Sequence, residues 1–257
     1  MARGWPDWEW DVIEPASEEP HLQLALDEVL LGSITAGRRR PTLRFWDWST
    51  PALVLGSHQS VRNEVDQREA ARFRFTICRR MSGGGTMLVE PGRTITYSLY
   101  APAQLVAGMS FVDSFAFLDG WVVDALQDLG VEAAHRPIND IVSPCGKIGG
   151  APQARRREAV LHHTAMAHAM DTEALPRLIR IGRRRLARHG LRSAEKEVSP
   201  LDTLLALDRD AVVRSLLAAF RRQHRTGPGC ITPEEDAHAR ELARAKYAQD
   251  SWIRRLP

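Results

Sequence analysis

Two adjacent arginines stand directly before three consecutive glycines in the segment RRMSGGG, residues 79–85. Glycine tolerates positive φ angles and lets another group come against the main chain. Successive amide N–H groups in such a turn can converge on an anion, and a guanidinium binds phosphate or carboxylate through paired hydrogen bonds. The segment therefore suggests a cradle for an anion or a nucleotide phosphate. A tight turn between strands with surface arginines explains the same residues, because glycine runs often mark turns.

A lysine precedes a second glycine pair in the segment NDIVSPCGKIGGAPQARRREAVLHH, residues 139–163. Lys147 is one of only three lysines, with Lys196 and Lys246, whereas the chain has 32 arginines. Its ammonium could reach a bound carboxylate or phosphate, although a lone lysine is more often solvated. The adjacent His162 and His163 point to opposite faces if this stretch is a strand, so at most one of them faces a given pocket.

The elements that must position these residues follow from periodicity and turn signals. Apolar residues at helical spacing, as in LQLALDEVLL, predict helices over 19–36, 110–130, 173–188, 208–224 and 233–248. Alternating or continuous apolar runs predict strands over 42–48, 52–56, 73–80, 86–90 and 94–100, and further strands in VEAAH, NDIV, KIGGA and AVLHHTAMAHAMD. The runs 86–90 and 94–100, joined by the turn PGR, are predicted to form a hairpin. The expected fold is α/β or α+β, with a mixed sheet built largely of hairpins and flanked by helices.

Composition narrows the class of protein. The chain has 257 residues, 44% of them hydrophobic and 26% charged, and a net charge of +3, an ordinary globular balance that does not by itself imply nucleic acid. Three cysteines, Cys78, Cys145 and Cys230, have neither disulfide-framework nor zinc-site spacing. The N-terminus lacks a signal-peptide pattern, and no apolar run approaches the ~18 residues of a membrane span. We expect a cytoplasmic protein with no membrane or nucleic-acid partner.

Together the two glycine-rich segments resemble the lipoate–protein ligase A family of the biotin/lipoate protein ligase superfamily. RRMSGGGTMLV is similar to that family's RR-x-SGGG signature, and NDIV, GKIGGAPQ and LHH are similar to its second motif, at matching spacing. The resemblance extends from about Leu22 to Trp252. It implies a mixed, mostly antiparallel sheet flanked by helices, akin to class II aminoacyl-tRNA synthetase and biotin ligase catalytic domains. It also implies that 1–257 is a single catalytic domain without the C-terminal accessory domain.

The resemblance implies a reaction in which ATP and lipoate form lipoyl-AMP, whose acyl group passes to a lysine of an acceptor. ATP and Mg²⁺ are the implied cofactors and lipoate the substrate. The implied partner is a lipoyl-domain protein, such as an E2 subunit, the glycine-cleavage H protein or a similar carrier. Whether a separate accessory-domain subunit is also required is left open.

The family's site residues carry over to matching positions. Lys147 is the implied catalytic residue, which contacts the acyl carbonyl and the α-phosphate, and Asp140 is a candidate Mg²⁺ ligand. The implied substrate- and ATP-binding residues are Arg80, Ser82, Gly83, Gly84, Gly85, Thr86, Met87, Leu88, Asn139, Asp140, Gly149 and His163. Three positions depart from the family pattern: Thr164 replaces a glycine, Pro152 replaces a small residue, and a short Pro144-Cys145 segment precedes the lysine.

Two rival functions remain on the sequence alone. Related acyltransferases move octanoyl groups through a cysteine thioester without ATP, and Cys145, two residues from Lys147, is the candidate thiol because a nearby cation lowers a thiol's pKa. The second rival is a non-catalytic acyl-binding or accessory member, which the retention of Arg80 and Lys147 disfavours. The basic run 182–193, GRRRLARHGLRS, is interpreted as a solvated helix face or a surface for an acidic acceptor domain.

Overall fold

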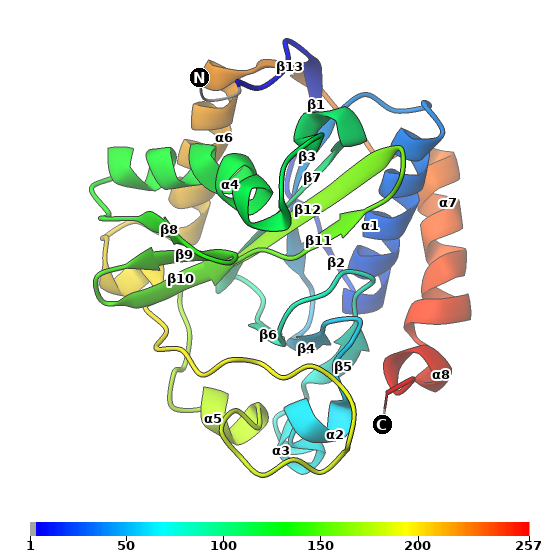
Figure 1. Cartoon of the computed structure of the whole chain (residues 1–257), viewed down its shortest axis with the longest axis vertical. Helices are drawn as coiled ribbons and strands as arrows, with labels where there is room; N and C mark the ends of the chain where they lie inside the picture. Colours follow the sequence, from blue (N-terminus) through cyan, green and yellow to red (C-terminus); the bar gives the residue numbers. More distant parts are fainter. Residues whose placement is uncertain (1–3, 257) are drawn as a thin grey trace.

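The computed structural model describes residues 4–256 and contains one large and one small β-sheet (Figure 1). The path of the large sheet runs β13-β1-β3-β7-β12-β10-β9-β8, with β11 added beside β12 and β2 beside β3. Its strands are β1 (Glu9–Ile13), β2 (Ser17–Glu18), β3 (Thr42–Trp48), β7 (Thr94–Pro102), β8 (Ala134–Arg136), β9 (Asp140–Ser143), β10 (Gly146–Gly150), β11 (Gln153–Arg155), β12 (Ala159–Ala167) and β13 (Arg225–Pro228). The pairs β1–β13, β1–β3 and β2–β3 are parallel and the others are antiparallel. The predicted mixed, mostly antiparallel sheet is confirmed.

Helices cover both faces of this sheet (Figure 1). On one face lie α1 (Pro20–Thr35) and α7 (Pro233–Leu242), which continues as the π-helical turn η3 (Ala243–Tyr247) and is followed by α8 (Asp250–Ile253). On the other face lie α4 (Phe111–Asp128) and α6 (Arg209–Gln223). Short 3₁₀ turns complete the chain at η1 (Ala103–Val106) and η2 (Leu201–Thr203). Four of the five predicted helices are thus confirmed.

Local signals account for where these helices begin and end. The first turn of α4 is capped by Ser110, whose hydroxyl accepts from the Asp113 amide, and the chain leaves the helix through Gly130 at a φ of 87°. Thr232 and Glu235 form a reciprocal capping box at the start of α7, where Pro233 occupies the first helical position. In α1 the predicted apolar face is buried against the sheet.

The small sheet corrects the predicted hairpin. It holds β4 (Ala52–Leu55) at its centre, with β5 (Thr76–Arg79) parallel on one side and β6 (Met87–Val89) antiparallel on the other. β7 follows β6 after one turn, but it pairs with β3 and β12 in the large sheet. The turn between the two strands is where the sequence predicts it, but the strands do not pair with each other. β6 buries an apolar side chain in one core and β7 buries its own in another, so each strand belongs to a different sheet. The glycine run lies on the connection from β5 to β6, beside the large sheet.

The predicted helix over 173–188 is also wrong. Only α5 (Leu175–Leu178) forms. The chain after it runs past Asn63, which donates to the carbonyls of Ala187 and His189, and residues 191–199 then cross to the far edge of the large sheet (yellow in Figure 1). Two short helices, α2 (Val61–Glu64) and α3 (Gln67–Arg72), lie beside α5 and the chain that follows it. Residues 191–199, here called the crossing segment, bridge to Gln59 at one end and to Lys147 at the other. The cluster of arginines gives no apolar stripe, so tertiary contacts decide its path. Among residues 4–256, no helix is long and apolar enough to cross a membrane.

Candidate active site

A cavity of about 520 Å³ lies between the two sheets, a volume within the ~300–1,000 Å³ usual for small-molecule sites. The glycine loop, residues 80–86, forms one wall, β10 and the end of β12 form a second, and the crossing segment forms a third. Apolar side chains supply much of the lining: Met87, Leu88, Ile148, Met166, Met170, Leu175, Ile179, Ile181, Leu191 and Val198. The two motifs predicted to form one site therefore do meet.

Both arginines hold the main chain of the site, and Arg80 also lines the cavity. Arg80 is buried and donates to the carbonyl oxygens of Val54, Gly83 and Gly85, at 2.9, 2.5 and 2.7 Å. Burial lowers the pKa of its guanidinium to about 9. Arg79 donates to the carbonyls of Gly56, Gln59 and Ile253, so it joins β5 to the C-terminal α8. The expected anion cradle is thus built differently, because the loop turns the carbonyl groups of Gly83 and Gly85 toward Arg80.

Glycines are required where the loop and β10 come close to other groups. Gly84 has a φ of 87°, and its carbonyl lies where a Cβ on Gly56 would stand. A Cβ on Gly149 would fall 2.6 Å from the Met166 side chain, and one on Gly150 would fall 2.7 Å from Lys147 Nζ. Of the predicted binding residues, Gly84, Gly85, Thr86, Met87, Leu88, Asn139, Asp140 and Gly149 line the cavity together with Arg80, whereas Ser82, Gly83 and His163 lie outside its lining.

Lys147 is the cationic centre of the cavity. Its Nζ lies 2.9 Å from Asp140 Oδ1, and the other oxygen of Asp140 pairs with the Lys196 ammonium. Burial lowers the pKa of Lys147, although Asp140 pulls it upward. Burial raises the pKa of Asp140, but the two ammonium groups outweigh it and the net pKa lies below its usual value. A lysine so placed can donate to an oxygen that gains negative charge in a reaction.

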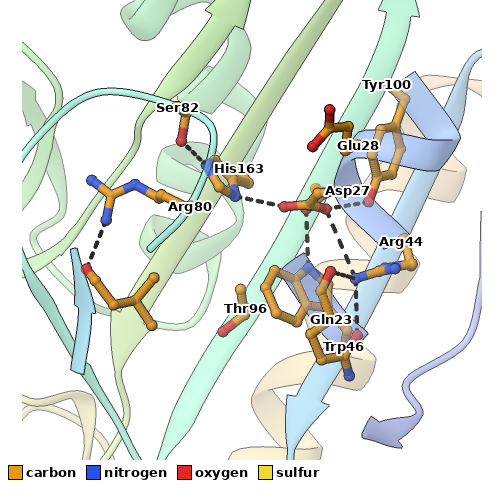
Figure 2. A network of polar contacts seen from close by, with 12 residues as sticks. Gln23, Asp27, Glu28, Arg44, Trp46, Arg80, Ser82, Thr96, Tyr100 and His163 are labelled. Carbon is orange, nitrogen blue, oxygen red and sulfur yellow. Dashed lines mark hydrogen bonds and ion pairs between the residues drawn. The ribbon is translucent and has the colours of Figure 1, made fainter. Parts of the chain in front are cut away.

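The second predicted histidine belongs to a buried chain of polar groups behind the glycine loop (Figure 2). Ser82 Oγ lies 2.6 Å from His163 Nε2, and His163 Nδ1 lies 2.8 Å from Asp27 Oδ2. Burial lowers the pKa of His163, against the opposite pull of Asp27. A neutral His163 with its proton on Nδ1 faces Asp27 and accepts from the Ser82 hydroxyl through Nε2. His163 therefore holds the loop through Ser82 and does not line the cavity, contrary to its expected place among the substrate-binding residues.

The cysteines and the expected metal ligand fit the site poorly. Cys145 is exposed in the turn between β9 and β10, and no cysteine of residues 4–256 lines the cavity. The Lys147 ammonium lies against Gly150. At about 3.3 Å per residue, the turn that carries Cys145 lies on the order of 15 Å along the strand from Gly150, so the thiol is far from the ammonium. Burial raises the pKa of Cys78 to about 12, which makes it inert.

Asp140 does not fit Mg²⁺ as its ligand, because each of its oxygens already faces a lysine ammonium. Within residues 4–256 no three His, Cys, Asp or Glu side chains are grouped to hold a metal ion. Asn139 donates to the Ala151 carbonyl at 2.7 Å and so holds the chain that follows β10.

Several site residues were not found from the sequence. Asp27 lies on α1, and Glu64 on α2 accepts from Ser193 Oγ at 2.5 Å and from Thr86 Oγ1 at 3.2 Å. These carboxylates carry no local signal, because their partners are distant in the chain. Lys196 did carry one, as one of three lysines in an arginine-rich chain.

Known proteins are similar to this chain in sequence and in fold. The family model "Lipoyl protein ligase A/B catalytic domain" matches residues 19–221. Octanoyltransferase LipM of Geobacillus kaustophilus is 26% identical over 273 residues, covering 95% of this chain and 97% of the relative. Octanoyltransferase LipM of Moorella thermoacetica is 25% identical over 272 residues, covering 96% and 98%.

Solved structures share the fold at lower identity. A bi-partite lipoate protein ligase from Thermoplasma acidophilum, studied with its E2 lipoyl domain, has a TM-score of 0.82 at 24% identity, covering 97% of this chain and 98% of its own. A lipoate-protein ligase A bound with ATP has a TM-score of 0.81 at 24% identity, covering 97% and 100%. Because the family model spans most of the chain and the fold agrees, the chain belongs to the lipoyl protein ligase A/B catalytic domain family, whose members are lipoate–protein ligases and octanoyltransferases.

Proposed function

We propose that this protein transfers an octanoyl or lipoyl group to the ε-amino group of a lysine on a small acceptor domain. The observation that carries the proposal is the Lys147 ammonium, held by Asp140 at the edge of an apolar-lined cavity. An eight-carbon acyl chain suits the apolar wall, and its carbonyl oxygen suits the cation. The E2 lipoyl domain studied with the Thermoplasma acidophilum ligase supports an acceptor of this kind.

The favoured acyl donor is a carrier-protein thioester, used without ATP. Relatives that align over nearly the whole chain are named octanoyltransferases, which supports this choice over adenylate formation. The acceptor amine attacks the thioester carbonyl, an amide forms, the carrier thiolate leaves, and the amine gives up one proton. Lys147 stabilises the oxyanion of the tetrahedral intermediate, a contribution of about 10²–10³ in rate for a single well-placed donor.

A thioester on Cys145 would be a two-step form of the same reaction. The exposed turn that carries Cys145 would have to move toward the cavity for its thiol to reach an acyl group beside Lys147. We therefore propose direct transfer, and we expect Cys145→Ser to keep the wild-type rate. Trapping of an acyl group on Cys145 by mass spectrometry, with loss of transfer in that variant, would instead establish the covalent route.

ATP-dependent ligation is the second candidate, favoured by two features of the cavity. No cysteine of residues 4–256 lines the cavity. The cavity also extends along Gly84–Leu88 to the Asn139–Asp140 pair, where a nucleotide would lie. A structural neighbour of the same fold is bound with ATP. ATP would supply activation of the free acid as an acyl-adenylate, and Arg80 and Lys147 would hold its negative charges.

The two candidates are separated by offering each donor to the purified protein. One reaction contains octanoyl carrier protein without ATP, and the other contains lipoate or octanoate with Mg-ATP, both with a lipoyl-domain acceptor. Mass spectrometry of the acceptor reads the product. We expect acylation from the carrier and none from the free acid. Acylation only with ATP would establish the ligase. Failure of both donors, including after addition of a separate accessory subunit, would overturn the proposed transfer.

Substitutions of Lys147 test its proposed role in stabilising the oxyanion. Lys147→Met should reduce transfer by about 10²–10³-fold while the fold is retained. Lys147→Arg keeps the charge but not the geometry, because a guanidinium cannot place a single compact charge against Gly150. Full activity in Lys147→Met would remove the assignment.

A further inference from the structure

The crossing segment brings a second lysine to the cavity at a fixed place. The segment is tied down before Lys196 by Ser193, whose hydroxyl donates to Glu64 and accepts from the Thr86 amide at 2.9 Å. It is tied down after Lys196 by two hydrogen bonds of 2.8 Å, from the Lys147 amide to the Glu197 carbonyl and from the Ser199 amide to the Lys147 carbonyl. The Lys196 ammonium then pairs with the buried carboxylate of Asp140.

Charge at this point of the cavity is unbalanced toward the positive. Asp140 supplies one negative charge between two ammonium groups, and Arg80 adds a guanidinium from the glycine loop. Without Lys196, Asp140 and Lys147 would form a neutral pair, and both carboxylate oxygens would be free to bind the one lysine. Such a pair would offer less to an oxyanion, because its charge is already compensated.

We propose that Lys196 is a positioning residue for Lys147: by occupying one oxygen of Asp140, it leaves the Lys147 ammonium only partly compensated, with net positive charge facing the acyl carbonyl. The inference deepens the proposed acyl transfer and rests on it. It applies to a thioester donor and to an adenylate alike, since the carbonyl oxygen gains charge in both.

The charged groups that act on the Lys147 ammonium come from three elements: Asp140 from β9, Lys196 from the crossing segment and Arg80 from the glycine loop. Burial is the main influence that lowers the pKa of Lys147, Asp140 raises it, and Lys196 and Arg80 lower it further as like charges. Removal of Lys196 must therefore raise the pKa of Lys147. Loosening the segment without removing a charge, as in Ser193→Ala, predicts no such change.

The chain's lysine content makes this measurable without an activity assay. Lysine labelled with ¹³C at Cε gives three side-chain signals, from Lys147, Lys196 and Lys246, whose titration by NMR reports each pKa. We expect the Lys147 pKa to rise in Lys196→Met and to stay near its wild-type value in Lys196→Arg. Ser193→Ala is the matched control, because it weakens the segment's other anchor without changing charge. Lys246, paired with Glu28, reports that the fold is intact.

Transfer assays complete the test. Lys196→Met should lower kcat by about tenfold, less than the ~10²–10³ of a direct oxyanion donor, and leave the KM for the acceptor nearly unchanged. Lys196→Arg should restore most of the rate. An unchanged or lower Lys147 pKa in Lys196→Met, or an unchanged kcat, would overturn the inference. If native protein acylates no acceptor, the proposed function fails, and the titration still decides whether Lys196 controls the charge of Lys147.

Discussion

Adjacent histidines on β12 serve two different polar clusters, one on each face of the large sheet. On the α1 face, Asp27 accepts from Tyr100 and Ser98 and faces His163. On the α4 face, Asp119 accepts from Tyr97 and Thr164 and contacts His162 at 2.7 Å. Strand alternation produces the symmetry, because β7 and β12 pair in register and send successive side chains to opposite faces.

The two clusters differ in what their histidines contact next. The free ring nitrogen of His163 meets Ser82, at the start of the glycine run, so its cluster reaches the site. His162 meets Gln153 instead, and Phe115 packs beside its ring, so that cluster leads away from the cavity. A buried histidine–aspartate pair is thus no sign of function by itself. Its third contact decides whether it supports a site or only the core.

The largest expected effect comes from removing the two aspartates. Asp27→Ala should lower the free energy of unfolding by about 3–5 kcal/mol, because Arg44, 3.8 Å from Asp27, becomes a buried charge without its carboxylate. Asp119→Ala should cost less, about 1–3 kcal/mol, since its partners are hydroxyl groups and a histidine. Urea unfolding measures both, with the exposed Asp128→Ala as control. If the two variants lost the same unfolding free energy, the unpaired charge of Arg44 would not be what makes the Asp27 cluster more sensitive.

Substituting the histidines tests the difference in function. His163→Gln should slow acyl transfer by about ten- to a hundredfold, because the glycine loop loses its link to Asp27 and small displacements at a reacting centre are costly. His162→Gln should destabilise the protein yet leave transfer close to the native rate. The rate is measured at a temperature where both variants are folded. Equal slowing would mean that both clusters position the site.

Acid should weaken the fold through His163. Its pKa in the folded state lies below the ordinary 6.5, so the unfolded chain binds the extra proton first. The stability this group contributes is full above pH 6.5 and is lost as the pH falls below that value. His224, whose pKa burial lowers to about 4, acts in the same direction between pH 6.5 and 4.

Unfolding free energies measured from pH 7 to 4.5 should therefore fall with acid. The slope should be flatter in His163→Gln and in His224→Gln. Asp27 contributes only at lower pH, because its pKa is depressed below 3.8. An unchanged slope in His163→Gln would place the neutral form of this histidine in doubt.

The smallest expected effect is that of single hydroxyl groups. Ser82→Ala removes the contact with His163, and Thr164→Val removes those with Asp119 and His162; each should cost about 1 kcal/mol of stability. Only Ser82→Ala should also slow transfer, by a few-fold at most. Thermal unfolding and the acceptor assay on both variants measure the contrast, and slowing by Thr164→Val would reverse the assignment of the two faces.

Much of the architecture was predictable because it is local. Apolar spacing predicted α1, α4, α6 and α7, and alternating or continuous apolar runs predicted β3, β4 and β12. The glycine loop and Lys147 were recognised because glycine and lysine have few substitutes at such positions. Residues of both segments line one cavity.

Tertiary structure alone decided which partners these elements meet. The separation of β6 from β7 into two sheets, the path of residues 180–199, and the pairs Asp27–His163 and Asp140–Lys196 all join residues far apart in the chain. Tertiary structure also decided that Cys145 lies in an exposed turn while the Lys147 ammonium lies against Gly150. The physical reason is that periodicity records which face of a segment is buried, whereas the choice of partner depends on closing the chain around a shared core.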